Sequence, residues 1–92
     1  MIDGTAKPAL LRGVRLHHDR VRETWVLLAP ERALRLDPVG HAILSRVDGE
    51  TPFDGIVADL AGVFDAPREQ IARDAGAFLT SLIERRMAEA RQ

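Results

Sequence analysis

The spacing of the apolar residues changes at Asp37, and this change limits the folds that the chain can adopt. Before Asp37, apolar and polar residues alternate, as in Val14–His18 and Arg32–Leu36, with the period of a half-exposed β-strand. After Asp37, apolar residues recur every three to four positions, with the period of an amphipathic helix. Since the chain has only 92 residues, we expect a single domain over 1–92 in which strands come first and helices follow.

Three strands are predicted before Asp37. Val14–His18 forms the first, and Glu23–Ala29 is apolar enough to be the central strand. Arg32–Leu36 forms the third, and in a meander it is an edge strand whose outer N–H and C=O groups have no partner. Its arginines are equally consistent with protection of that edge against other chains. Residues 1–12 show no regular period, and we interpret them as a flexible lead-in.

Three helices are predicted after the strands. Asp37 is a good N-cap for the first, which ends before Gly49. Thr51 is the expected cap of the second, which runs to about Phe64, and Pro67 opens the third. The third helix has the strongest periodic signal, carried by Ile71, Ala75, Phe78, Leu79, Leu82, Ile83 and Met87. This order predicts an α+β domain of the winged helix-turn-helix type, with a three-stranded antiparallel sheet followed by three helices.

The size and composition of the chain exclude several classes of protein. A chain of 92 residues has a thin core and little room for an enclosed pocket. It has no cysteine, which excludes a disulfide framework and thiol catalysis. Its apolar runs, such as Trp25–Pro30, are too short to cross a bilayer, and residues 1–12 lack the pattern of a secretory signal. We therefore expect a cytoplasmic protein.

Two groups of polar residues could suggest catalysis or metal binding. Within His17–Asp19, neighbouring side chains on a strand point to opposite faces, so they cannot chelate one ion together. His41, Ser45 and Asp48 contain the residue types of a catalytic triad, but the chain has no nucleophile elbow. We therefore predict no catalytic residue, no metal and no cofactor.

Nucleic-acid binding is the alternative function, because a winged helix-turn-helix can place its last helix in the major groove of DNA. The last helix, however, mixes acidic and basic residues, and the chain has one lysine, Lys7. The charge is also uneven, since residues 1–36 carry seven Lys and Arg against four Asp and Glu, and residues 37–92 carry six against ten. Two oppositely charged halves favour two different partners.

Several segments closely resemble the PqqD family of small pyrroloquinoline quinone (PQQ) biosynthesis proteins, over roughly Leu11 to Met87. The resemblance is carried by Val14–Asp19, Trp25–Arg32, Leu36–Asp37, Ile43–Gly49 and Phe78–Leu82. The segment Trp25–Arg32 is the most specific, because the shorter ones also mark the wider group of peptide-recognition domains. Where such domains commonly have a glycine that stops the last helix, this chain has Arg85–Ala88, which predicts a longer helix.

The resemblance implies a recognition element and not an enzyme. PqqD-like proteins bind a ribosomally made precursor peptide, PqqA, and present it to PqqE, a radical S-adenosylmethionine enzyme. In the related recognition domains, the leader part of the peptide adds as a strand to the third strand and rests against the third helix. Strand addition takes affinity from main-chain hydrogen bonds and specificity from alternate side chains. Whether two copies of the chain pair through the same edge stays open.

Carried over to this sequence, the resemblance predicts a docking strand and an opposing helix row. The docking strand consists of Arg32, Ala33, Leu34, Arg35 and Leu36. The opposing row on the last helix consists of Ala72, Gly76, Leu79 and Ile83. Arg35 is the expected charge contact, and the small Ala72 and Gly76 would let a peptide backbone approach closely. The same pattern would arise if the two small residues only let helices pack together and Leu79 belonged to the core.

Overall fold

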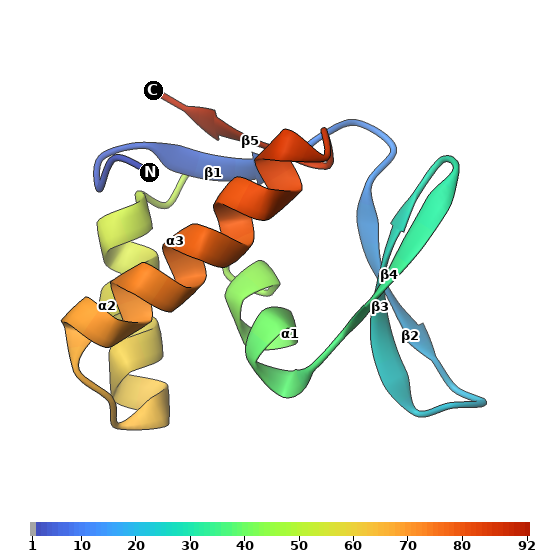
Figure 1. Ribbon diagram of the computed structural model, residues 1–92, viewed down its shortest axis with the longest axis horizontal. Helices are drawn as coiled ribbons and strands as arrows, with labels where there is room; N and C mark the ends of the chain where they lie inside the picture. Colours follow the sequence, from blue (N-terminus) through green and yellow to red (C-terminus); the bar gives the residue numbers. More distant parts are fainter. Residues whose placement is uncertain (1) are drawn as a thin grey trace.

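The computed structural model describes residues 2–92, which form two separate sheets and a cluster of three helices (Figure 1). In chain order the elements are β1 (Lys7–Leu10), β2 (Arg15–Asp19), β3 (Thr24–Ala29), β4 (Arg32–Leu36), α1 (Pro38–Leu44), α2 (Phe53–Phe64), α3 (Arg68–Glu84) and β5 (Ala88–Arg91). The predicted α+β fold, with a three-stranded antiparallel sheet and three helices, is confirmed. No helix in the described part of the chain is long and apolar enough to span a membrane.

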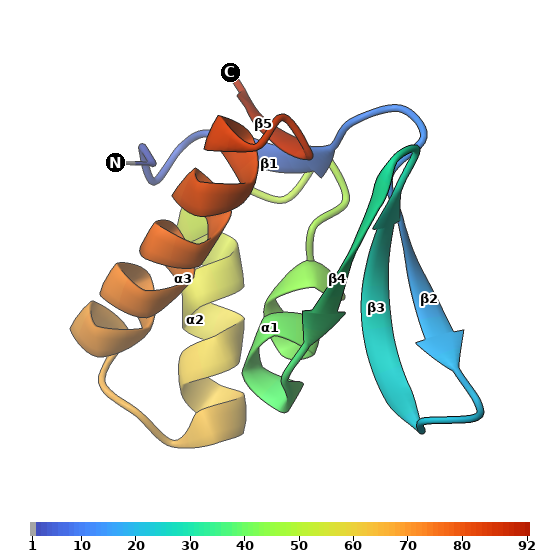
Figure 2. The same cartoon turned by 45° about the vertical axis from the view of Figure 1, so that its right-hand side comes forward.

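The three-stranded sheet has the strand order β2-β3-β4, and both of its strand pairs are antiparallel. The predictions that β3 is central and β4 is an edge are therefore confirmed. Leu27 of β3 lies between Leu16 of β2 and Leu34 of β4, and it is fully buried. These leucines form the inner face of the sheet, because alternate residues of a strand share a face. In Figure 2, β4 is the strand of this sheet nearest the helices.

The first helix begins as predicted but ends early. The Asp37 side chain accepts a hydrogen bond from the Gly40 N–H at 2.7 Å, which confirms Asp37 as the N-cap of α1. The helix ends at Leu44, with Ser45 as its C-cap, so the prediction that it continues until Gly49 stops it at the C′ position is wrong. After Leu44, the i to i−4 hydrogen bonds of the helix give way to the i to i−3 hydrogen bonds of a tighter turn.

The N-cap predicted for the second helix is also wrong. Pro52 holds the N-cap position of α2 and makes no side-chain cap hydrogen bond. Thr51 instead donates its hydroxyl to the Asp48 carboxylate at 2.9 Å. The hydroxyl therefore bonds to a carboxylate within the loop and does not cap the helix. Such local side-chain hydrogen bonds are common for Asp and Thr in turns.

The core lies between the helices and the inner face of the sheet. Its largest buried members come from β3, all three helices and the segment after α3, and they include Leu27, Leu44, Ile56, Leu60, Leu79, Leu82 and Met87. The buried residues of α2 and α3 recur at the predicted helical spacing, which explains why one face of each helix is covered. Leu79 is fully buried, as expected for a core leucine.

A second sheet, missed by the sequence analysis, joins the two ends of the chain. β1 pairs antiparallel with β5, with Lys7 opposite Arg91 and Leu10 opposite Ala88. The predicted flexible lead-in covers residues 1–12, of which residue 1 is outside the described part of the chain. Residues 2–12 are not without regular structure, because Lys7–Leu10 form a strand with Pro8 and Ala9 buried. Lys7–Leu10 shows no period of two, and the alternation in Ala88–Arg91 extends over only four residues, so their pairing depends on the tertiary structure.

The missing glycine had predicted that the last helix continues through Arg85–Ala88, and this prediction is wrong. It ends at Glu84, and Arg86 takes a left-handed backbone with φ of 59°. The Arg86 N–H donates to the Ile83 carbonyl at 3.0 Å, and the Met87 N–H to the Leu82 carbonyl at 2.9 Å. This pair of bonds is a Schellman motif, which most often has glycine at the left-handed position. Arg86 therefore replaces that glycine without removing the helix stop.

Candidate functional site

An open groove of about 580 Å³ lies between the edge strand β4 and helix α3. From β4 it is lined by Leu34, Arg35 and Leu36, and from α1 by residues that include Val39, Gly40 and Ile43. From α3 it is lined by Asp74, Phe78, Ser81, Leu82 and Arg85. The outer edge of β4, which has no partner strand in residues 2–92, therefore runs along a hollow instead of facing open solvent.

The groove has an apolar floor and a charged rim. Leu36, Ile43 and Leu82 form the floor, and all three are buried. Arg35 and Asp74 are exposed on the two sides of the rim. A surface of this kind covers apolar side chains of a ligand and leaves polar groups at the margin to select charges.

One hydrogen bond and one close approach set the distance between the walls of the groove. At one end, the Arg32 guanidinium Nη2 donates to the Arg85 carbonyl at 2.6 Å, which connects the start of β4 to the end of α3. Near the middle, a Cβ added at Gly40 would lie 3.4 Å from Phe78 Cζ and 3.2 Å from Asp37 Oδ1. The absence of a side chain at Gly40 thus lets the Phe78 ring approach α1.

The predicted docking strand and the predicted helix row have different outcomes. Leu34, Arg35 and Leu36 line the groove, and Arg32 closes its end. Ala33 lies on the other face of the sheet, where it lines a different hollow together with Arg35 and the half-buried Val26 and Leu28. Leu34 and Leu36 thus supply one side of the groove, as the alternation of side chains requires, and Arg35 borders both hollows.

The predicted helix row, in contrast, does not line the groove. Leu79 is fully buried, and a Cβ added at Gly76 would lie 3.6 Å from Phe53 Cζ of α2. Neither Ala72 nor Ile83 contributes to the groove wall. The flank of α3 that faces β4 is instead the row Asp74, Phe78, Ser81 and Arg85, with spacing i, i+4, i+7 and i+11. Small residues at the predicted row let α2 and α3 pack together, which was the other interpretation of that pattern.

Trp25 and two histidines form a stack outside the lining of the groove. The Trp25 indole lies 4.3 Å from the His41 ring, at an interplanar angle of 14°, and 5.0 Å from the His18 ring. The stack joins β2, β3 and α1, since these residues come from three different elements. Trp25 is half-buried and does not line the groove, so its position indicates a role in packing the sheet against α1 and not in contact with a ligand in the groove.

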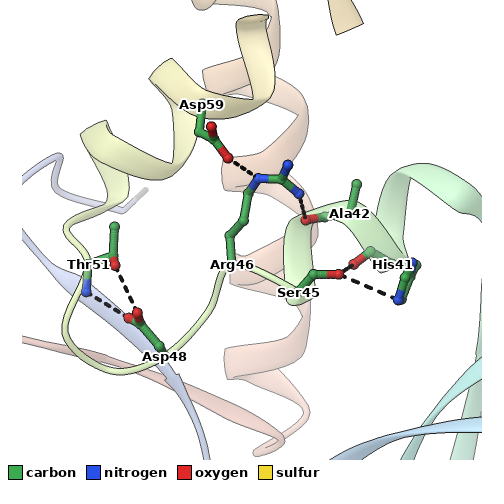
Figure 3. Close-up of polar contacts among 7 residues, drawn as sticks. All are labelled: His41, Ala42, Ser45, Arg46, Asp48, Thr51 and Asp59. Carbon is green, nitrogen blue, oxygen red and sulfur yellow. Dashed lines mark hydrogen bonds and ion pairs between the residues drawn. The ribbon is translucent and has the colours of Figure 1, made fainter. Parts of the chain in front are cut away.

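The residues of the suspected triad are used for local structure (Figure 3). The Ser45 hydroxyl donates to the His41 carbonyl at 2.5 Å, and its oxygen lies 3.4 Å from His41 Nε2. The Asp48 carboxylate accepts from the Thr51 N–H at 2.7 Å and from the Glu50 N–H at 2.9 Å, so it points away from His41. The Thr51 and Glu50 amides lower the pKa of Asp48, since hydrogen bonds to a carboxylate favour its charged form.

Figure 3 also shows how α1 is attached to α2. The Arg46 guanidinium forms an ion pair with Asp59 of α2 and donates to the Ala42 carbonyl at 2.8 Å. Among residues 2–92, no three His, Asp or Glu side chains are grouped so that they could hold a metal ion. Within the described residues, the groove beside β4 is therefore the feature with the chemistry of a binding site.

The sequence model of the PqqD family, described as coenzyme PQQ synthesis protein D, matches residues 24–88. This chain belongs to the PqqD family. The matched residues include β3, β4 and the three helices, and thus every element that lines the groove.

Individual PqqD-family relatives are similar over nearly the whole chain. A protein of Rhizobium meliloti (strain 1021) named PqqA binding protein is 51% identical over 89 residues, covering 97% of this chain and 91% of the relative. A protein of the same name from Xanthomonas campestris pv. campestris (strain 8004) is 44% identical over 80 residues, covering 87% of each chain.

Two solved structures are similar as well. The solution structure of the PqqD truncation of Methylobacterium extorquens PqqCD has a TM-score of 0.82 and 39% identity, covering 97% of this chain and 95% of that one. It is described as a functional, stand-alone recognition element for a ribosomally synthesised and post-translationally modified peptide. The crystal structure of PqqD from Xanthomonas campestris has a TM-score of 0.58 and 42% identity, covering 94% of this chain and 96% of that one.

Proposed function

We propose that this chain binds the precursor peptide PqqA by strand addition at β4 and presents it to the radical S-adenosylmethionine enzyme PqqE. The observation that carries the proposal is the unpaired edge of Arg32–Leu36, which runs along the groove against α3. The name of the Rhizobium meliloti relative, PqqA binding protein, supports the choice of peptide. The whole chain acts as one recognition domain in this proposal.

The physical chemistry of the groove suits an extended peptide. Main-chain groups on the open side of β4 supply hydrogen bonds to an added strand. Alternate side chains of that strand would face the apolar floor at Leu36, Ile43 and Leu82. Arg35 and Arg85 at the groove favour acidic residues of the peptide, and Asp74 favours a basic residue. No enclosed cavity is required, since the strand provides most of the contact.

In this proposal the chain supplies binding, and the partner enzyme supplies the chemistry. The acidic helical half is the surface left for PqqE once the groove holds the peptide, because the side of the helices away from β4 stays exposed. The proposal places the protein in the cytoplasm and includes no cofactor. Two copies that paired through β4 would occupy the same edge as the peptide, so light scattering should show any such dimer dissociate when PqqA is added.

Nucleic-acid binding, the alternative function, gains no support from the groove. The exposed side of α3 carries Glu69, Asp74 and Glu84 besides its arginines, and these carboxylates would repel phosphates. A gel shift with random duplex DNA at low salt tests this alternative directly.

Amide hydrogen exchange tests strand addition at β4. With saturating PqqA, the amides of Arg32–Leu36 that face the groove should exchange more slowly. Those of Arg15–Asp19 provide the control, because β2 is the other edge of the same sheet and lies away from the groove. Equal protection of both edges, or of neither, would contradict strand addition at β4 even if calorimetry detected binding.

The charge contact is tested by two matched variants. Arg35→Glu should weaken PqqA binding by about 1 kcal/mol, or roughly fivefold, as expected for an exposed charge pair. Arg15→Glu makes the same charge change on β2, outside the groove, and should leave the Kd within about twofold. A similar loss in both variants would mean that only the overall charge matters. Calorimetry that detects no PqqA binding by the unmodified chain would refute the proposed function itself.

A further inference from the structure

A second hollow lies between the three helices, next to the groove. It has a volume of about 190 Å³ and an apolar lining from α1, the end of α2 and the start of α3. The lining includes Val39, Ile43, Phe64 and Ile71. A drug-sized ligand usually needs about 300 to 1,000 Å³, so this hollow has the size for a single side chain.

Two side chains at this hollow are unusually exposed for their type. Val39 is 47% exposed and Phe64 is 39% exposed, whereas the large apolar residues of the core are covered. Single exposed apolar residues are common on protein surfaces, but a concave group of them indicates a contact surface. These two residues come from different helices and line the same hollow.

The hollow is continuous with the groove beside β4. Val39, Ile43 and Asp74 line both. An extended segment that follows the groove past Leu36 would therefore reach the hollow over α1. Asp74 stands at the junction with an exposed carboxylate that forms no ion pair within residues 2–92. The junction thus favours a cation beside the apolar hollow.

We propose that this hollow, defined by Val39, Ile43, Phe64, Ile71 and Asp74, is an anchor site for one apolar side chain of the peptide that pairs with β4. A basic side chain next to that apolar residue binds the Asp74 carboxylate. The inference rests on the proposed function and adds a requirement to it. The peptide must carry an apolar residue beside a basic one, outside the segment that forms the added strand.

Two neighbouring residues of α2 allow a matched test with PqqA. Phe64→Ser removes apolar lining from the anchor site and should weaken binding by roughly 5- to 30-fold. Val63→Ser removes a side chain that is 58% exposed and lines neither the groove nor the hollow between the helices. The Kd of this variant should stay within about twofold of that of the original protein. Thermal unfolding confirms that both variants fold. Val39→Thr, which nearly preserves the shape of the side chain, gives the same test from α1.

A third variant and a direct contact measurement complete the test. Asp74→Asn should weaken binding several-fold at low salt and reduce its salt dependence, because it removes one charge at the junction. Nuclear Overhauser contacts should connect a peptide side chain to the Phe64 ring and the Ile71 methyl groups. Equal affinity of Phe64→Ser and Val63→Ser would refute the anchor site.

The possible failures are distinguishable. If PqqA protects β4 while Phe64→Ser binds normally, the anchor site is wrong and the proposed function stands. If the unmodified chain does not bind PqqA, both are wrong. If Phe64→Ser changes the oligomeric state without peptide, the hollow is covered by a second copy and the inference is overturned.

Discussion

Replacement of Arg86 by glycine should stabilise the protein, although it removes a charged side chain from the surface. Arg86 has a φ of 59°, in the left-handed region where a Cβ clashes with the neighbouring carbonyl oxygen. That clash costs about 1 to 2 kcal/mol for a residue with a side chain. Glycine avoids the clash but loses about 0.5 to 1 kcal/mol more conformational entropy on folding. The expected net gain in the free energy of unfolding is therefore about 0 to 1.5 kcal/mol, centred on ~0.75 kcal/mol.

The adjacent arginine provides the control. Arg85 has a φ of −84°, which any residue adopts without strain. Arg85→Gly makes the same change in charge and composition but can only lose entropy, so it should destabilise by about 0.5 to 1 kcal/mol. The Arg85 carbonyl that receives the Arg32 hydrogen bond belongs to the main chain and remains in this variant.

Urea and thermal unfolding, followed by circular dichroism, measure the two changes. For a domain of this size, 1 kcal/mol corresponds to about 4 to 8 °C in Tm. The variants should therefore differ by several degrees and lie on opposite sides of the original protein. If Arg86→Gly is destabilised as much as Arg85→Gly, then the left-handed turn at Arg86 carries no strain and the reasoning is refuted.

Two further predictions concern stability. Gly62→Ala should stabilise α2 by about 0.5 to 1 kcal/mol in urea unfolding, because an added Cβ meets nothing within 4 Å. Gly40→Ala should leave the free energy of unfolding unchanged or lower it, because the added Cβ would crowd Asp37 Oδ1 and Phe78. An equal gain in stability in Gly62→Ala and Gly40→Ala would contradict the close contact at Gly40. The lowered pKa of Asp48 contributes stability above the unfolded-state pKa, and this is lost as the pH falls through the lower folded-state value. Asp48→Asn should thus reduce the fall in the free energy of unfolding at acid pH. An unchanged slope of the free energy of unfolding against pH would contradict this prediction.

The sequence by itself determined the local elements whose signals lie within a few residues. The alternation in Arg32–Leu36 predicted β4 at its observed bounds, and Asp37 predicted the start of α1. The apolar content of Glu23–Ala29 predicted the central strand. The resemblance to PqqD proteins predicted a docking strand at β4, the edge that borders the groove. Each of these depends on side-chain periodicity or capping, which neighbouring residues control.

Only the tertiary structure decided which flank of α3 faces β4. The apolar stripe of the helix is wide, and its periodicity assigns Leu79 and Phe78 to the same side. Packing against α2 buries Gly76 and Leu79, which leaves Phe78 and Asp74 to face the groove. The row that lines the groove is thus the one that the other helices do not cover.

The pairing of β1 with β5 and the turn at Arg86 were likewise decided by tertiary structure. Lys7 and Arg91 lie at opposite ends of the sequence, and no local pattern connects them. Burial of Met87 and the pairing of β5 hold the chain in a left-handed turn that arginine does not favour by itself. Local propensity is worth about 1 kcal/mol per residue, so contacts between distant segments can override it. The edge strand could be recognised from the sequence, but the groove beside it exists only because such distant contacts position α3.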